Sequence, residues 1–167
     1  MKKVSDSIVV MHELVLPNDT NILGNVLGGR VMHLIDICAA MSAYKHARSP
    51  VVTASIDHLN FLSPAKKGDI LILKSSVNYV STTSMEIGVK VESENAITGK
   101  VKHTASAHLT FVALDDSRKP KKIEKVKAIT DIEKKRYNAA RKRVEDRKKG
   151  LSKWLHIIYS KVIILNW

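Results

Sequence analysis

Apolar and polar positions first divide the chain into a strand, a loop and a long helix. Residues 8–16 are β-branched and apolar and stop at Pro17, which predicts a strand. A polar, glycine-bearing loop follows over residues 17–29. From residue 30 to about residue 48 the chain has no glycine or proline and is apolar on every side. That pattern is typical of a buried helix, and Ser49-Pro50 marks its end.

Four further stretches have the pattern of strands. They cover residues 51–62, 69–80, 84–94 and 100–114, and the last two alternate with period two. Because the connectors are short, we expect hairpins and an antiparallel meander. One helix buried against one antiparallel sheet is an α+β arrangement. From about residue 130 to residue 149 the chain predicts a charged, exposed helix.

The length and composition favour one globular domain in a reducing compartment. With 167 residues, the chain is long enough to bury a sizeable core. Cys38 is the only cysteine, so neither an internal disulfide nor a thiolate metal cluster can form, and we expect a cytoplasmic protein. The N-terminal apolar run is interrupted by polar residues such as Asp6 and Glu13 and has no small-residue cleavage site after it. We therefore interpret it as part of the mature protein.

The net charge of +12 is concentrated outside the predicted fold. Residues 1–117 hold eleven basic and eleven acidic residues, whereas residues 118–149 hold fifteen basic and five acidic ones. A domain that binds nucleic acid through its folded core should carry the excess there. We therefore expect no nucleic-acid partner.

Asp36 is the most informative single residue. It lies in mid-helix between Ile35 and Ile37, on an element that we predict to be buried. A carboxylate without partners is costly to bury, so Asp36 must be exposed at a crevice, paired, or retained for function. The structural alternative is a pair with a lysine or arginine at a subunit interface.

The start of the helix is a second candidate. Gly28 and Gly29 let a ligand or another backbone approach closely, and the first amides of a helix suit an anion or a developing oxyanion. A turn is the simpler interpretation of the two glycines. Asn21 and Asn25 precede them, and each is by default a turn residue.

The remaining candidates favour structural roles. Cys38 falls in an apolar run, as expected for a small core residue. His58, His103 and His108 lie in alternating strand patterns without metal-ligand spacing, so we predict no metal site. The chain has no phosphate-binding loop of the Walker type, no dinucleotide fingerprint and no Gly-x-Ser-x-Gly motif.

Three runs together carry a family resemblance. They are LPNDTNILGNVLGGRVMHLID, then TASIDHLNFLSPAKKGD about thirty residues on, and later HTASAHLTFVALDD. Over roughly residues 7–149 the chain resembles the hexameric acyl-CoA hydrolases of the hot-dog superfamily. The resemblance implies a long central helix wrapped by a curved antiparallel sheet. It also implies dimers that pair edge to edge, a trimer of dimers, and hydrolysis of fatty acyl-CoA without a separate cofactor.

The resemblance also assigns roles to residues at a site completed by two subunits. Asp36 matches the family's aspartate and would act as general base on a water, or attack as a nucleophile. The family's loop asparagine lies fifteen residues upstream and matches Asn21 rather than Asn25. The amides of Gly28 and Gly29 would polarise the thioester carbonyl.

For the phosphates of coenzyme A, we expect basic residues on the surface. The candidates are Lys66, Lys67, and the basic segment from Arg118 to Lys122, which includes Lys119. Some members of the family bind guanine nucleotides as regulators, so a regulatory nucleotide is a further partner that the resemblance admits.

The expected layout has three parts. Residues 1–128 form the hydrolase domain, residues 129–149 a basic helix, and residues 150–167 an apolar tail beyond the usual end of the family. The tail is a poor membrane span, although contact with a membrane surface stays open. One alternative function is a hot-dog dehydratase using His33, three residues before Asp36. Another is a non-catalytic module that binds acyl-CoA or a polyanion through the basic C-terminus.

Overall fold

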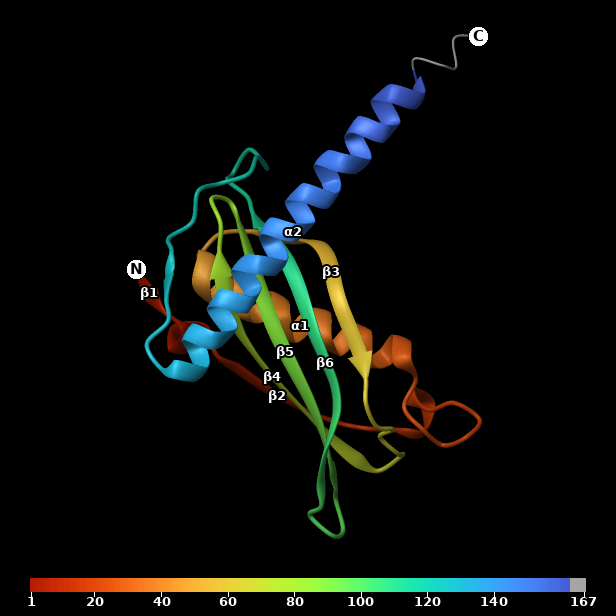
Figure 1. The fold of residues 1–167 in the computed structure, drawn as a ribbon. Helices are drawn as coiled ribbons and strands as arrows, with labels where there is room; N and C mark the ends of the chain where they lie inside the picture. Colours follow the sequence, from red (N-terminus) through yellow and green to blue (C-terminus); the bar gives the residue numbers. More distant parts are fainter. Residues whose placement is uncertain (163–167) are drawn as a thin grey trace.

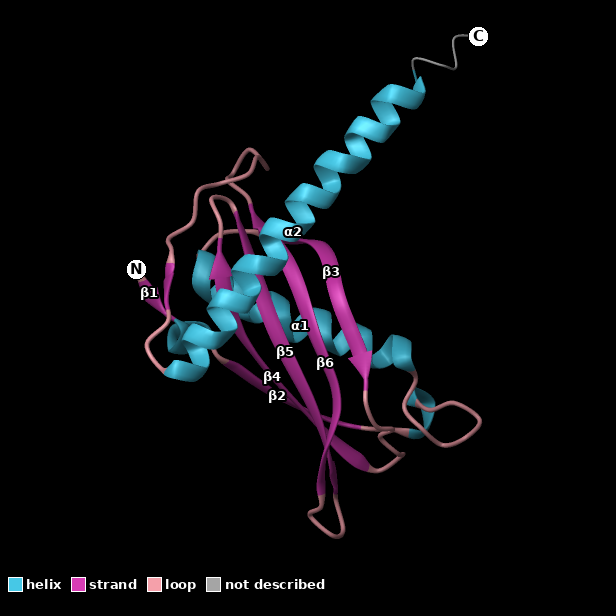
Figure 2. Ribbon diagram, in the orientation of Figure 1, coloured by secondary structure: helices cyan, strands magenta, loops and turns pink. Residues whose placement is uncertain are grey.

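The fold is one long helix laid across the inner face of a five-stranded antiparallel sheet, with a second helix on the outer face (Figures 1 and 2). The computed structural model describes the backbone of residues 1–162 and the side chains of residues 1–150. Two helices, five main strands and four short elements make up this part of the chain: β1 Lys2–Lys3, η1 Val4–Ser7, β2 Val9–Leu14, η2 Pro17–Asp19, α1 Gly28–Ala47, β3 Val51–Phe61, β4 Asp69–Val80, β5 Ser84–Asn95, β6 Val101–Ala113, β7 Val126–Lys127 and α2 Asp131–Val162.

The sheet confirms the predicted α+β class and corrects the predicted pairing. Its strand order is β2-β4-β5-β6-β3, so β4, β5 and β6 form the expected meander. β3 does not form a hairpin with β4; it pairs antiparallel with β6 at one edge, while β2 pairs with β4 at the other. The connector after β3 is short, but it runs from the β3 edge to β4, the second strand from the opposite edge, in a sheet that curves around α1 (Figure 1).

The core lies between α1 and the inner face of the sheet. Strand residues of alternate positions point toward α1, among them Met85, Ile87, Val89 and Val91 on β5. On α1 the buried positions follow helical spacing: Val31, Leu34, Ile35, Cys38, Ala39, Ser42, Ala43 and His46. The helix ends where Arg48 adopts a left-handed conformation, with φ of 50°, just before Pro50.

α1 is therefore buried on one side only, not all round as its composition predicts. Four large apolar side chains on its other side are exposed by more than a third: Met32, Ile37, Met41 and Tyr44. The neighbouring edge strand β3 exposes Val52 and Ile56 as well. Ile56 shares the α1-facing side of β3, whereas Val52 lies in register with Val112 on the outer face. The single chain leaves the apolar side chains of α1 and Ile56 uncovered, which is typical of an interface.

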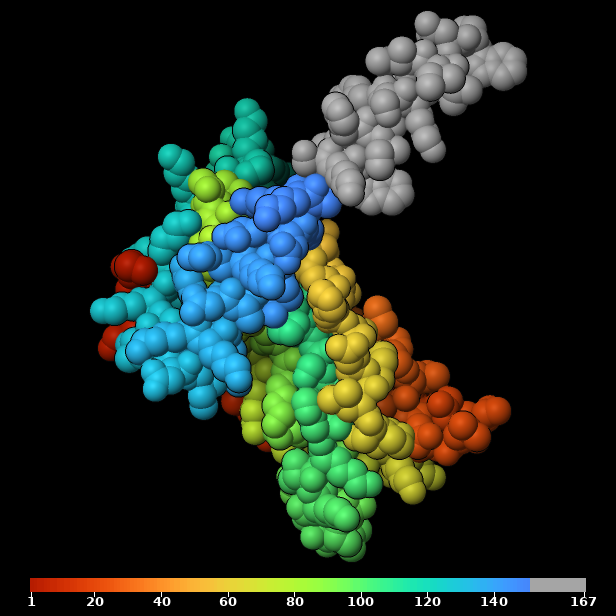
Figure 3. Space-filling model, viewed as in Figure 1, coloured from red at the N-terminus to blue at the C-terminus, as the bar shows by residue number. Residues whose placement is uncertain are grey.

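α2 is less exposed than its charge predicts and begins close to the expected position. It lies across the outer face of the sheet, where Ala140 and Val144 are buried and Tyr137 packs edge to face on Tyr79 with ring centroids 5.1 Å apart. Figure 3 shows α2 covering one part of this face, while other parts of β3, β5 and β6 stay open. The helix continues to Val162, past the expected end at residue 149. No helix in the described residues has the length and hydropathy needed to span a bilayer.

Candidate active site

Asp36 lies at the boundary between the buried and the exposed sides of α1. It directly follows buried Ile35 and is itself only half-buried. The hydroxyl of Thr53 on β3 donates a hydrogen bond of 2.8 Å to Asp36 Oδ1. Within the described side chains, no lysine or arginine forms an ion pair with Asp36. The chain thus holds one carboxylate oxygen in place and leaves the other available for a water.

Asn21 has the turn role that its residue type predicts. Its side-chain oxygen accepts hydrogen bonds from the backbone N–H groups of Leu23 at 2.9 Å and Asn25 at 3.2 Å. Gly24, with φ of 74°, completes this tight loop. Asn21 itself is exposed, and its oxygen is used by the loop. The side-chain NH₂ group is consequently the part of Asn21 that faces an incoming ligand as a donor.

Gly28 and Gly29 are the first two residues of α1. The first amides of an α-helix have no acceptor within the helix, and no side chain caps this end of α1. Neither glycine has a positive φ. A Cβ on Gly28 would lie 3.5 Å from the Phe61 ring, and a Cβ on Gly29 would meet nothing within 4 Å. The absence of side chains leaves the exposed amides open to an approaching carbonyl oxygen.

The structure separates these residues into two groups within one chain. Asn21, Gly28 and Gly29 lie at the loop and the start of α1, whereas Asp36 lies eight residues further along the helix. At a rise of about 1.5 Å per residue, eight residues span roughly 12 Å. Among the described residues, no hydrogen bond joins Asn21 to Asp36. Within one chain, Asn21 and the start of α1 therefore do not meet Asp36.

The four basic candidates also fall into two groups. Lys66 and Lys67 lie in the turn before β4, where the Lys67 N–H donates to the Gly24 carbonyl at 3.0 Å. Their turn is thus joined to the Asn21 loop. Arg118 and Lys119 follow β6 in the 114–125 connector, beyond the end of the sheet where β6 finishes. β4 begins at the opposite end, so within one chain the expected phosphate ligands do not form one cluster.

The other candidate residues from the sequence lie in environments that favour structural rather than catalytic roles. Burial raises the pKa of the Cys38 thiol, and Cys38 lies in the core beside Ser75, as predicted. His33 is exposed and, among the described residues, makes no hydrogen bond to Asp36. His58 and His108 are neighbours in the β3–β6 register, and their rings pack edge to face with centroids 6.5 Å apart.

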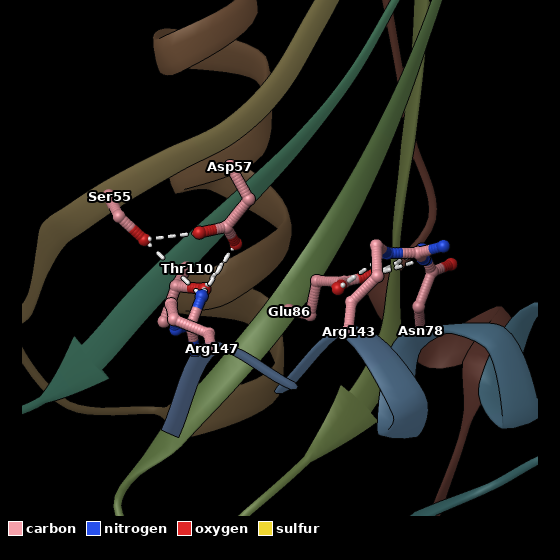
Figure 4. A network of polar contacts seen from close by, with 7 residues as sticks. All are labelled: Ser55, Asp57, Asn78, Glu86, Thr110, Arg143 and Arg147. Atoms are coloured by element: carbon pink, nitrogen blue, oxygen red, sulfur yellow. Dashed lines mark hydrogen bonds and ion pairs between the residues drawn. The ribbon is translucent and has the colours of Figure 1, made fainter. Parts of the chain in front are cut away.

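A second polar cluster attaches α2 to the outer face of the sheet (Figure 4). Arg143 donates two hydrogen bonds to the fully buried carboxylate of Glu86, at 2.7 and 3.1 Å. Arg147 donates to Asp57 at 2.6 Å, and Ser55 and Thr110 donate to the same carboxylate. Burial acts to raise the pKa of Asp57, but these hydrogen bonds outweigh it and hold the pKa below its ordinary value. The cluster has every charge paired and functions as an anchor.

Thr53 is the residue that sequence patterns do not reveal. Threonine is an ordinary strand residue, and nothing in the alternation of β3 distinguishes Thr53 from its neighbours. Only the packing of β3 against α1 places its hydroxyl on Asp36.

Comparisons with known proteins agree on one family. Residues 23–100 match the model of the thioesterase superfamily. The uncharacterized acyl-CoA thioester hydrolase YkhA of Bacillus subtilis is 41% identical over 86% of this chain and 83% of its own. An apo hexameric acyl-CoA thioesterase superimposes with a TM-score of 0.86 at 46% identity, over 89% of this chain and 96% of the other.

The acyl-CoA hydrolase of Staphylococcus aureus superimposes with a TM-score of 0.87 at 40% identity, over 96% of this chain and 98% of the other. Its structure is known in complex with butyryl-coenzyme A, coenzyme A and coenzyme A disulfide. Three alanine variants of that enzyme also have known structures. They replace an asparagine, an aspartate fifteen residues later, and a threonine seventeen residues after the aspartate.

Proposed function

This chain belongs to the thioesterase superfamily and is an acyl-CoA thioester hydrolase, and we propose that Asp36, held by Thr53, activates the attacking water. The Thr53–Asp36 hydrogen bond carries the proposal. Asn21, Asp36 and Thr53 have the same spacings as the three residues replaced in the Staphylococcus aureus enzyme. Those spacings support all three residues as members of one site.

In the proposed step, a water attacks the thioester carbonyl carbon while Asp36 accepts its proton. Thr53 keeps the carboxylate oriented by its hydrogen bond to Oδ1, so the second oxygen faces the water. The negative charge that develops on the carbonyl oxygen is stabilised by the Gly28 and Gly29 amides at the positive end of α1. Collapse of the tetrahedral intermediate breaks the C–S bond, expels the coenzyme A thiolate and leaves the free acid, and the proton held by Asp36 passes to the thiolate. Direct attack by the Asp36 carboxylate is the alternative, and it would pass through an anhydride.

We propose that the complete site forms between two protomers. One protomer supplies Asn21, Gly28 and Gly29, and the other supplies Asp36 with Thr53. Two observations support this arrangement: the roughly 12 Å between the half-sites along α1, and the apolar surface of α1 and β3 that the single chain exposes. A pair of β3 edges joined into one continuous sheet would cover that surface. The hexameric state of related thioesterases supports a trimer of such dimers.

The test is a thiol-release assay over acyl-CoAs of increasing chain length. The wild-type protein should release thiol, and Asp36→Asn should lose turnover by roughly 10²–10⁴-fold, the contribution typical of general-base catalysis. Asp131→Asn is the matched control, because that carboxylate is fully exposed at the start of α2. It should keep wild-type turnover. Near-normal turnover by a folded Asp36→Asn protein would refute the proposed role of Asp36.

A further inference from the structure

The third residue of α1, Arg30, joins the helix to two segments that precede it in the chain. Its Nη2 lies 2.5 Å from Glu13 Oε1 on β2, and its Nε lies 3.1 Å from Asp19 Oδ1 in η2. Between 18% and 35% of each of the three side chains is exposed, so the ion pairs are shielded from much of the solvent. Shielded pairs are weakened less by water and salt than pairs at an open surface.

Asn21 lies in a small hairpin whose base is formed by Asp19 and Leu27. The Leu27 N–H donates to the Asp19 carbonyl at 2.8 Å, and the Asn21 N–H donates to the Asn25 carbonyl at 2.8 Å. Gly28 follows Leu27 directly, so the base of the hairpin adjoins the first amide of α1 (Figure 1). The position of Asn21 relative to that amide therefore depends on how firmly the base is held.

Asp19 holds the base with both oxygens of its carboxylate. Oδ2 accepts the N–H of Leu16 at 3.2 Å, and Oδ1 is the partner of Arg30. Because Arg30 belongs to the first turn of α1, its pair with Asp19 fixes the hairpin to the helix. Glu13 holds the guanidinium from β2. One guanidinium with two carboxylates has a net charge of −1, so this cluster does not attract the phosphates of an anionic substrate.

We propose that Arg30 is a positioning residue, which acts through Asp19 to hold the side chain of Asn21 in place beside the amides of Gly28 and Gly29. The inference rests on the proposed function. Donors that stabilise a developing charge are effective when they are placed before the reaction begins, since then no reorganisation is needed during it. Asn21 is exposed in its loop, and the Arg30–Asp19 pair supplies the rigidity that an exposed loop lacks.

The first experiment measures kcat and KM for acyl-CoA by thiol release in wild type, Arg30→Met and Arg30→Lys. Methionine removes both ion pairs, and we expect kcat to fall about ten- to a hundredfold, the order of effect that a small misplacement of a reacting group produces. KM should change by less than about threefold, because the displaced donor acts on the transition state. Lysine keeps one charge and should recover part of the loss. Arg141→Met is the matched control, since its pair with Glu145 is exposed on α2, and it should keep wild-type kcat.

The two carboxylates around Arg30 allow a second comparison. Asp19 uses both oxygens as acceptors, and asparagine offers only one, so Asp19→Asn must lose either the Leu16 N–H or Arg30. Glu13 contacts Arg30 through one oxygen, which glutamine can replace. We therefore expect Asp19→Asn to lower kcat clearly more than Glu13→Gln. The reverse order would contradict an effect that reaches the loop through Asp19.

A double-mutant cycle with Asn21→Asp separates positioning from general support of the fold. Aspartate keeps the oxygen that the turn uses but removes the NH₂ donor. If Arg30 acts through that donor, Arg30→Met should lower kcat by less than about twofold once Asn21→Asp is present. Losses that multiply in the double variant would overturn the proposal, and so would a near-normal kcat of Arg30→Met alone.

The outcome stays decisive if one variant is unstable. Should Arg30→Met fail to fold, the same cycle with Asp19→Asn in its place has the same two expected results. Light scattering of each variant shows whether its assembly matches that of the wild type. Wild type that released no thiol from any acyl-CoA would refute the proposed function itself, whereas an active wild type with an unaffected Arg30→Met refutes only the role of Arg30.

Discussion

At the scale of single residues, two carboxylates of the fold differ in how completely their oxygens are hydrogen-bonded. Asp36 and Glu86 are both carboxylates in elements with apolar cores. Glu86 is fully buried and held by two hydrogen bonds from Arg143. Asp36 is half-buried, has one hydroxyl donor and no described cationic partner. The pairing of Glu86 is that of a structural carboxylate, whereas the second oxygen of Asp36 is open to a water, as a general base requires.

Thr53 provides the residue-scale prediction. Thr53→Val keeps the shape of the side chain but removes the hydrogen bond to Asp36, so we expect kcat for acyl-CoA to fall about tenfold, the order of one such bond. KM should change little, since Thr53 orients the carboxylate rather than the substrate. Thr53→Ser restores the hydroxyl and should recover most of the activity. If valine and serine variants were equally impaired, packing rather than the hydrogen bond would explain the loss.

Part of this site follows from the sequence and part does not. Asp36 is identified by the contrast between its charge and the apolar helix around it, and the glycines by their place before that helix. Thr53 is missed because threonine is common in strands and its partner is distant in sequence.

At the scale of elements, local patterns predict the strands and α1 but not how they pair. Alternation indicates which residues of β5 and β6 face the core, and proline and glycine mark where elements end. The place of β3 at the far edge depends on the sheet curving around α1, which no local pattern contains. The contacts of α2 with the outer face cannot be predicted from the sequence either. Arg143 and Arg147 fit the pattern of a solvated basic helix, and only the folded structure brings them to Glu86 and Asp57.

The anchoring of α2 gives the element-scale prediction. Arg143→Met leaves the buried Glu86 carboxylate without its main partner, so we expect the free energy of unfolding to fall by about 3–5 kcal/mol. Adding Glu86→Gln to the same chain should recover part of this loss, because the unpaired charge is gone. Urea unfolding at fixed protein concentration measures both. Arg141→Met is the matched control: its pair with Glu145 is exposed, and its loss should cost under about 1 kcal/mol.

At the scale of the whole molecule, the single chain is incomplete in two ways, and a second protomer would complete both. It exposes an apolar stripe on α1 beside an unpaired β3 edge, and it separates Asn21 from Asp36. Unpaired edges and large apolar surfaces promote association. We expect the purified protein to run as a dimer or larger, with a hexamer as the main species, when measured by light scattering at several concentrations. A monomer with full activity would contradict both the interface and the shared site.

The shared site can be tested with the interface residues left unchanged, by mixing two inactive variants. In a mixed dimer of Asn21→Ala and Asp36→Asn, one site receives both damaged residues and the other receives two intact ones. Random pairing makes about half of all dimers mixed, so reassembly should recover roughly a quarter of wild-type thiol release. If one chain supplied both residues, every site in every mixture would keep a defect. The subunits must first be dissociated and reassembled, and a tagged partner confirms that they exchanged. Activity that stays at the level of the separate variants after proven exchange would place Asn21 and Asp36 in the same protomer's site, because only a site divided between protomers can be repaired by mixing.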